Sequence, residues 1–216
     1  MHYSPILILN GEPNSVFSEI FFKTLNKGII KSPLILISSY KILKKQMKKL
    51  KFKKKIKLIN YKNFNYQKLD NKTINLINVD FNQKKAFEKI SKKSNKFIHK
   101  SFQVAFEILK EGNIKKFING PISKKNFLDK KFLGITEYIS KEFKTKKSCM
   151  LIYNKNLSVS PLTTHLPIKQ VTKKINKKSI NEKVILINNF YKNFLGFTPR
   201  IAVLGLNPHC ETVHNF

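Results

Sequence analysis

Two histidines follow short apolar runs and could act together on one ion or substrate. His165 stands in the segment TTHLP (163–167), and His209 ends the segment RIAVLGLNPH (200–209). Each apolar run has the length and composition of a buried strand. Ligands bind at the carboxyl ends of strands in open α/β sheets, so two strands could bring both imidazoles to one site. Either histidine alone could equally cap a strand and bond a loop carbonyl. The pair, each with a proline nearby, favours a site.

Three turn segments lie where strands are expected to give way to helices. NGEPNS (10–15) follows the opening strand, and its backbone amides could hold an anion. INGPISK (118–124) ends in Lys124, which could meet a phosphate or carboxylate. GITEY (134–138) places Thr136 and Glu137 at the start of a helix, where N-terminal amides favour negative charge. Taken singly, each is more often an ordinary turn or helix cap.

The elements that must position these residues alternate between strand and helix. Helices are expected over 15–26, with Val16, Ile20 and Leu25 on one side, and through Phe97 to a stop at Gly112. A further helix is expected over 179–194, with Ser179 as N-cap and Gly196 just past its end. The alternation predicts an α/β fold with a parallel or mixed sheet covered on both faces. Strands are expected at 6–10, 34–38, 56–61, 74–79, 115–119, 148–153, 157–161 and 200–206.

The charge of the chain does not by itself indicate a nucleic-acid partner. The net charge is +31, but Arg200 is the only arginine, whereas nucleic-acid readers favour the bidentate arginine fork. We interpret the lysines, including the dense run over 44–57, mainly as compositional drift on a solvated surface. Cys149 and Cys210 are too few for a disulfide framework. Without a signal-peptide core or spanning segment, we expect a cytoplasmic protein with no membrane partner and no specific nucleic acid.

The order of the motifs is more specific than any one of them. Gly-Glu-Pro near the start, then Gly-Pro-Ile-Ser-Lys, Gly-x-Thr-Glu, Thr-Thr-His-Leu-Pro and Leu-Asn-Pro-His resembles the 4-hydroxythreonine-4-phosphate dehydrogenase family of vitamin B6 (pyridoxal phosphate) synthesis. The resemblance implies NAD- or NADP-dependent oxidation of 4-phosphooxy-L-threonine to 2-amino-3-oxo-4-phosphooxybutanoate, which decarboxylates to 3-amino-2-oxopropyl phosphate. It also implies a three-layer α/β/α fold with a mixed sheet, similar to isocitrate and isopropylmalate dehydrogenases, and a homodimer.

The resemblance also assigns residues. His165 and His209 match two of the family's three ligands for a divalent metal, which could be zinc, magnesium or cobalt, and Thr136 matches a substrate-binding threonine. Ile135 stands where the family usually has a substrate-binding histidine. Weaker candidates near the cleft are Ile135, Glu137, Lys124 and Asn207.

Two departures from the family pattern affect what we expect of the chain. Residues 14–17 are Asn-Ser-Val-Phe where the family has Ala-Gly-Ile-Gly. The sequence stops shortly after His209, whereas the family continues for roughly another third of its length, including the third metal ligand and the phosphate-binding residues. We therefore expect residues 1–216 to be the N-terminal two-thirds of such an enzyme, with no assigned internal boundary, and to be inactive and poorly soluble alone.

Two other functions remain open. The chain could be a lysine-rich protein that binds polyanions on an inactive enzyme fold, which steeply salt-dependent binding to RNA or heparin without a response to NAD would favour. It could instead be a dehydrogenase of another phosphorylated or carboxylated hydroxy acid, which Ile135 makes plausible.

Overall fold

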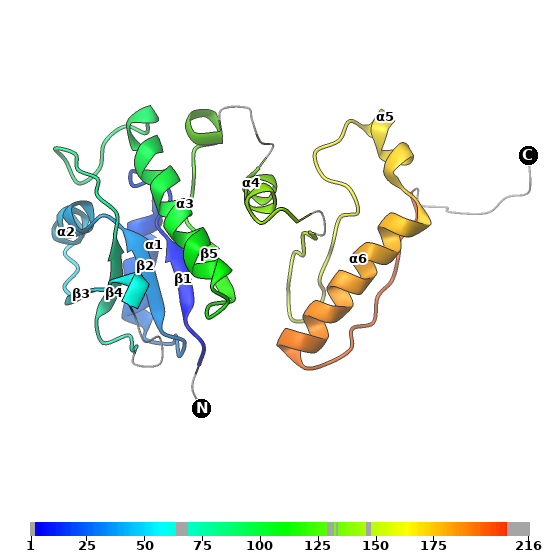
Figure 1. Ribbon diagram of the computed structural model, residues 1–216, viewed down its shortest axis with the longest axis horizontal. Helices are drawn as coiled ribbons and strands as arrows, with labels where there is room; N and C mark the ends of the chain where they lie inside the picture. Colours follow the sequence, from blue (N-terminus) through cyan, green and yellow to red (C-terminus); the bar gives the residue numbers. More distant parts are fainter. Residues whose placement is uncertain (1–2, 64–68, 129–131, 133, 146–147, 207–216) are drawn as a thin grey trace, which may run out of the picture. The chain divides into compact units, whose positions relative to one another are not determined.

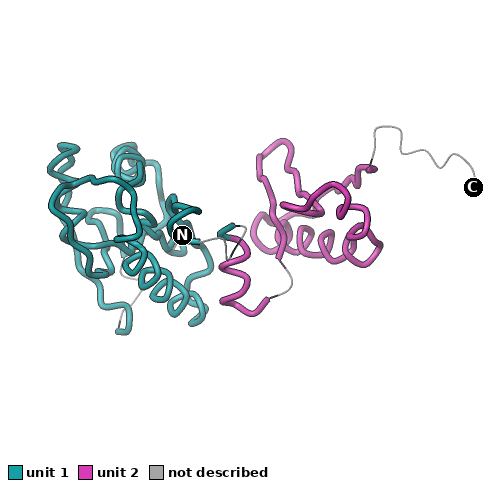
Figure 2. The backbone as a smooth tube through the Cα atoms, turned by 90° about the horizontal axis from the view of Figure 1, so that it is seen from above, with its two compact units in different colours: residues 1–135 teal, residues 136–216 magenta. Residues whose placement is uncertain are grey.

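The chain forms two compact units in a computed structural model, which describes residues 3–63, 69–128, 132, 134–145 and 148–206. Unit 1 is Met1–Ile135 and unit 2 is Thr136–Phe216 (Figure 2). No helix in the described part of the chain is both long enough and apolar enough to span a membrane.

Unit 1 is built on a five-stranded sheet in the order β3-β4-β2-β1-β5. All four pairs of neighbouring strands are parallel, and Ile6 of β1 stands level with Leu34 of β2 on one side and Lys116 of β5 on the other. The prediction of a parallel or mixed α/β sheet is confirmed, and so are all five strands expected before residue 120. The strands are β1 (Ile6–Leu9), β2 (Leu34–Ser38), β3 (Ile56–Leu58), β4 (Ile74–Asn78) and β5 (Lys116–Asn119).

Helices cover both faces of this sheet, as the continuous burial of all five β2 residues requires. Helices α1 (Phe17–Lys27) and α2 (Tyr40–Lys49) pack on one face, where their apolar residues form a core with Ile8, Leu36 and Leu76. Helix α3 (Asn95–Lys110) packs against β1 and β2 and is seen in front of the sheet in Figure 1. Side chains alternate between the faces along each strand, so Leu7 and Ile35 point to the side opposite Ile8.

The buried face of α1 differs from the expected one. Val16 and Ile20 are exposed, and the helix instead buries Phe17, Phe21 and Phe22. The Phe22 ring stacks on Phe52 with centroids 4.4 Å apart. The phenylalanines remove more apolar area from water than valine and isoleucine would, so they decide which face turns inward.

Unit 2 contains most of α4 (Ile135–Glu142), the short α5 (Ile168–Val171) and α6 (Lys177–Phe190), which continues as a π-helix, η6 (Tyr191–Leu195). The expected helix therefore exists, but its N-cap is Asn176. Ser179 occupies the third helical position, where it completes a reciprocal capping box with Asn176. Gly196 ends the segment with φ of 80°, as predicted.

The strands expected in the last third of the chain were predicted wrongly. Segments 148–153 and 157–161 share one isolated antiparallel bridge, Ile152 with Val159, and residues 200–206 form no strand. Leu204 is 88% exposed. An apolar run forms a strand only when a neighbouring strand completes its backbone hydrogen bonds. No segment in the described part of the chain pairs with residues 200–206.

The remaining short helical turns are η1 (Tyr61–Asn63), η3 (Lys92–Ser94), η4 (Lys124–Leu128) and η5 (Thr172–Lys174). Of these, η3 leads directly into α3, and the π-helix η4 follows the turn after β5. Both therefore lie in the connections around the carboxyl edge of the sheet.

Candidate functional site

The sheet of unit 1 has a topological switch point between β1 and β5. β1 connects through α1 to its neighbour β2, whereas β5, on the other side of β1, is reached from β4 through α3 on the opposite face. In open α/β sheets ligands bind outside the carboxyl ends of the strands at such a point. The loops that begin at Asn10 and Gly120 are therefore the candidate site of unit 1.

These two loops touch through their backbones. The Glu12 amide donates to the Pro121 carbonyl at 2.8 Å, and the Gly120 amide donates to the Leu9 carbonyl at 2.7 Å. A Cβ placed on Gly11 would lie 2.4 Å from the Pro121 oxygen, and one on Gly120 would lie 2.1 Å from the Asn10 oxygen. Both glycines are thus required by close packing, and Gly11 also by its φ of 73°.

Glu12 is a buried carboxylate at the start of the first loop and is 1% exposed. Its Oε2 accepts a hydrogen bond from the Ser94 hydroxyl at 2.6 Å, and its Oε1 accepts one from the Asn14 amide at 3.1 Å. The Ser15 amide bonds the Glu12 carbonyl at 3.1 Å. The amides of residues 12, 14 and 15 therefore have internal acceptors. The loop is a closed turn around a carboxylate, which is the ordinary-turn alternative of the sequence analysis and not the anion site.

A polar network holds this loop against the segment that follows β4. Gln46 of α2 donates to the Pro13 carbonyl at 2.7 Å, and Asn14 exchanges hydrogen bonds with Gln83 at 2.7 and 3.2 Å. The Glu88 amide also donates to the Asn14 side chain at 2.8 Å. Sequence reasoning missed this network because Gln83 and Glu88 lie in a weakly patterned region and because each contact joins residues distant in the chain.

Asn10, at the carboxyl end of β1, has a buried side-chain oxygen without a hydrogen-bond partner among the described residues. Its Nδ2 donates to the Ser38 hydroxyl at 2.9 Å, while its Oδ1 is buried without a partner among the described residues. A buried polar atom of this kind normally bonds to water or to a ligand. Asn10 therefore adds one hydrogen-bonding group to the switch point.

The predicted site residues of unit 1 are Lys124 and Ile135. Lys124 is exposed at the start of η4, just after the Gly-Pro turn that follows β5. Ile135 is partly buried and is the first residue of α4. The strand, turn and lysine predicted over 118–124 are therefore in place, with the lysine reaching solvent.

The remaining predicted residues lie in unit 2 or outside the described residues. Thr136 and Glu137 occupy the first turn of α4 and are partly buried, which confirms that this segment opens a helix. His165 is exposed in the loop before α5, with a left-handed φ of 56°. Asn207 and His209 lie outside the described residues, so the shared metal site of the two histidines stays a prediction. In the described ranges, no three metal-ligating side chains gather.

Tyr138 follows these residues on α4. Burial, and secondarily the nearby Glu142 carboxylate, raise the pKa of the Tyr138 phenol above its ordinary value. Both effects favour the protonated phenol, which can donate a hydrogen bond. The sequence indicated only that Tyr138 lies next to Glu137; its partial burial is a result of the fold.

Comparison with solved structures shows which known proteins share this fold. A 4-hydroxythreonine-4-phosphate dehydrogenase from Klebsiella pneumoniae superposes with a TM-score of 0.80 and 21% identity, over 96% of this chain and 65% of that one. A putative enzyme of the same name from Salmonella typhimurium gives a TM-score of 0.82 at 21% identity, over 100% of this chain and 67% of that one. At these identities the likeness defines the fold.

Sequence comparison identifies the family. Residues 30–214 match the family described as pyridoxal phosphate biosynthetic protein PdxA, and the chain belongs to it. A relative from Sulfurihydrogenibium sp., named 4-hydroxythreonine-4-phosphate dehydrogenase, is 33% identical over 95% of this chain, and one of the same name from Wigglesworthia glossinidia brevipalpis is 26% identical over 95%. The chain spans 64% and 62% of the lengths of these two relatives. The resemblance found from the motifs is thereby confirmed.

Proposed function

We propose that the protein containing this chain oxidises 4-phosphooxy-L-threonine with NAD or NADP, and that the product decarboxylates to 3-amino-2-oxopropyl phosphate in pyridoxal phosphate synthesis. The observation that supports this most is the whole-chain similarity to the Sulfurihydrogenibium relative named for this activity. The order of the Gly-Glu-Pro, Gly-x-Thr-Glu and Thr-Thr-His motifs adds to it. On this proposal the enzyme is a cytoplasmic homodimer.

In the proposed mechanism His165 and His209 would hold a divalent ion such as zinc, cobalt or magnesium. The exposed side chain of His165 fits this role because imidazole nitrogens are common ligands of zinc and cobalt. When bound, the ion would lower the pKa of the substrate hydroxyl that is oxidised. Thr136 and the first amides of α4 would bind and orient the anionic end of the substrate.

A second candidate is the oxidation of another phosphorylated or carboxylated hydroxy acid. Ile135 favours it, because a partly buried hydrocarbon side chain stands where the family usually has a substrate-binding histidine. Isoleucine cannot form the hydrogen bond that a histidine would give the substrate. The polar substrate group at this position would then have no partner, which lowers the preference for a substrate that carries it. A panel of phosphorylated and carboxylated hydroxy acids would distinguish the two candidates by their kcat/KM values.

The proposed activity predicts chelator-sensitive NADH formation. We expect a version of the chain extended through the family's C-terminal motifs to reduce NAD when given 4-phosphooxy-L-threonine and a divalent ion, because hydride transfer requires the hydroxyl carbon to be held against the nicotinamide. NADH formation by the extended enzyme that a chelator leaves unchanged would contradict the metal-assisted mechanism, and no turnover of this substrate would contradict the proposed activity.

Thr136→Val in the extended enzyme tests the substrate contact. Valine keeps the shape of threonine but removes the hydroxyl, so we expect kcat/KM for 4-phosphooxy-L-threonine to fall about tenfold, the size of one hydrogen bond to a charged group. Thr145→Val, in the exposed segment after α4, is the matched control. Equal kinetics for the wild type and Thr136→Val would remove Thr136 from the site.

A further inference from the structure

A pocket lined by lysines lies between α2 and β3 in unit 1. Its volume is about 620 Å³, and its walls come from the first half of α2 and from the segment that leads into β3. β3 and β5 are the two outer strands of the sheet, so this pocket lies at the opposite edge from β5. We call it the α2–β3 pocket; its lining residues are Tyr40, Lys44, Lys53, Lys54, Lys55 and Ile56.

The chain around this pocket is rich in lysine and contains no acidic residue. Residues 41–57 contain ten lysines in seventeen positions, against 43 basic residues in 216 for the whole chain. The whole stretch over 20–69 has no aspartate or glutamate. Among the described residues, none of the four pocket lysines forms an ion pair. The pocket therefore gathers more positive charge than the composition of the chain alone would give.

One carboxylate from another segment is linked to the rim of the pocket. The Tyr40 amide donates to Asn78 Oδ1 at 2.8 Å, and Asn78 Nδ2 donates to Asp80 Oδ1 at 3.0 Å. Asp80 therefore lies near the start of α2, where its single negative charge leaves the four lysines with a net positive charge. Lys45 does not line the pocket, and its Nζ donates to the Asn82 side chain at 3.0 Å.

The backbone that carries the pocket lysines is held by the core. The Phe52 side chain is buried and stacks on Phe22, and its amide donates to the Met47 carbonyl at 2.9 Å. The Lys55 carbonyl accepts the Ile74 amide at 2.8 Å, which fixes the end of the segment to β4. A ligand would therefore have to order only the lysine side chains, and not the loop that carries them.

Tyr40 adds an aromatic ring to the pocket. The side chain is 36% exposed, and Lys44 Nζ lies 5.9 Å from the centroid of its ring. Of the described residues that line the pocket, only Tyr40 and the partly buried Ile56 are apolar. Attachment to a lipid bilayer requires a large apolar surface, whereas a nucleic-acid base needs only one ring on which to stack. The chemistry of the pocket therefore favours a nucleic acid over a membrane.

We infer that the α2–β3 pocket binds single-stranded nucleic acid without sequence preference, with backbone phosphates on its lysines and a base on Tyr40. Lysine ammonium groups contact phosphates as point charges, which supply affinity but do not distinguish the bases. A flexible single strand can follow a concave surface, whereas a duplex or a flat membrane would contact only its rim. The inference does not rest on the proposed function, because binding is measured without turnover.

Fluorescence anisotropy of a labelled oligouridine of about 12 nucleotides, titrated with the 216-residue chain, tests the inference. Lys44→Gln/Lys54→Gln removes one lysine from each wall of the pocket and should weaken binding about tenfold or more. The slope of the logarithm of the binding constant against that of the salt concentration should become shallower by about 1.4, because each phosphate contact to a single strand contributes about 0.7.

Tyr40→Leu tests the base contact separately. Leucine keeps an apolar side chain at the start of α2 but removes the ring, so we expect oligouridine binding to weaken about fivefold. Binding of inorganic polyphosphate, which has no base, should stay unchanged.

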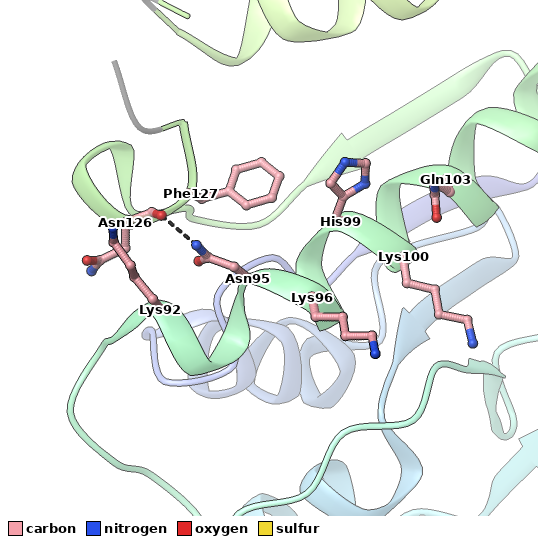
Figure 3. A pocket seen from close by; sticks show the side chains of 8 residues that line it. All are labelled: Lys92, Asn95, Lys96, His99, Lys100, Gln103, Asn126 and Phe127. Carbon is pink, nitrogen blue, oxygen red and sulfur yellow. Dashed lines mark hydrogen bonds between the residues drawn. The ribbon is translucent and has the colours of Figure 1, made fainter. Parts of the chain in front are cut away.

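Lys96→Gln/Lys100→Gln is the matched control for the lysine variant. These two lysines extend from the exposed face of α3, which packs on the opposite face of the sheet from α2 (Figure 3). Their replacement removes the same charge and should change oligouridine affinity less than about twofold at physiological salt, because exposed charges are screened over about 8 Å. Circular dichroism should give the same melting temperature for all three variants.

Four outcomes would overturn the inference. Equal weakening by the two lysine pairs would show that the net charge of +31 attracts anions without a site. Unchanged oligouridine affinity in Tyr40→Leu would show that the pocket contacts phosphate groups alone. Tighter binding to phosphatidylserine vesicles than to oligouridine would make this surface a membrane contact. No measurable binding of oligouridine at low salt would exclude a nucleic-acid site.

Discussion

Gly11→Ala is expected to destabilise unit 1 by about 2 to 5 kcal/mol, the sum of left-handed backbone strain and overpacking. The added methyl group would lie 2.4 Å from the Pro121 carbonyl oxygen, which also accepts the Glu12 amide. Because that oxygen belongs to the backbone of the neighbouring loop, the clash can be relieved only by separating the loops after β1 and β5. Hydrogen exchange at the β1 amides and chemical unfolding followed by circular dichroism would measure the loss.

Gly112→Ala is the matched control for this prediction. Gly112 has a φ of 79°, close to that of Gly11, but a Cβ placed on it meets no atom within 4 Å. Gly112→Ala should therefore lower the free energy of unfolding only by the strain of the left-handed conformation, about 1 to 2 kcal/mol. If the two variants lose the same stability, the close approach of the two loops is not what requires glycine at position 11.

His165→Asn in the extended enzyme is expected to lower metal-dependent kcat/KM by on the order of 10²- to 10³-fold, because a ligand of the proposed ion is lost. Asparagine is chosen because it tolerates the left-handed conformation that His165 adopts at φ of 56°. The backbone of the loop should therefore be preserved while the imidazole is removed. Bound metal per chain, measured by elemental analysis after dialysis, should fall together with the activity.

Lys144→Asn provides the control for this second variant. Lys144 is exposed, lies in the same unit and has a similar φ of 49°. Its replacement should leave metal content and kcat/KM near those of the wild type. Normal metal content and turnover in His165→Asn, with the same melting temperature as the control, would show that His165 is a structural loop residue.

The buried strands of unit 1, β1, β2 and β4, could be predicted from local sequence because each is a short and largely apolar run. The LILIS run of β2 is apolar on both faces, which only a sheet covered on both sides satisfies. The similar run over 200–206 is not a strand, because strand formation also needs a hydrogen-bonded neighbour. The N-cap of α6 was displaced by three residues, since Asn176 and Ser179 can both cap a helix and their mutual bonds decide the start.

The candidate site, like the fold, was predictable from the sequence only in part. The sequence by itself determined the family, through the order of its motifs, and the turns that carry Glu12, Lys124 and Thr136. Only the tertiary structure decided that Glu12 is buried against Ser94, 82 residues away, and that the amides of its turn are occupied rather than open to an anion. The physical reason is that turns and periodicity depend on neighbouring residues, whereas burial and hydrogen-bond partners depend on which distant segments the sheet brings together.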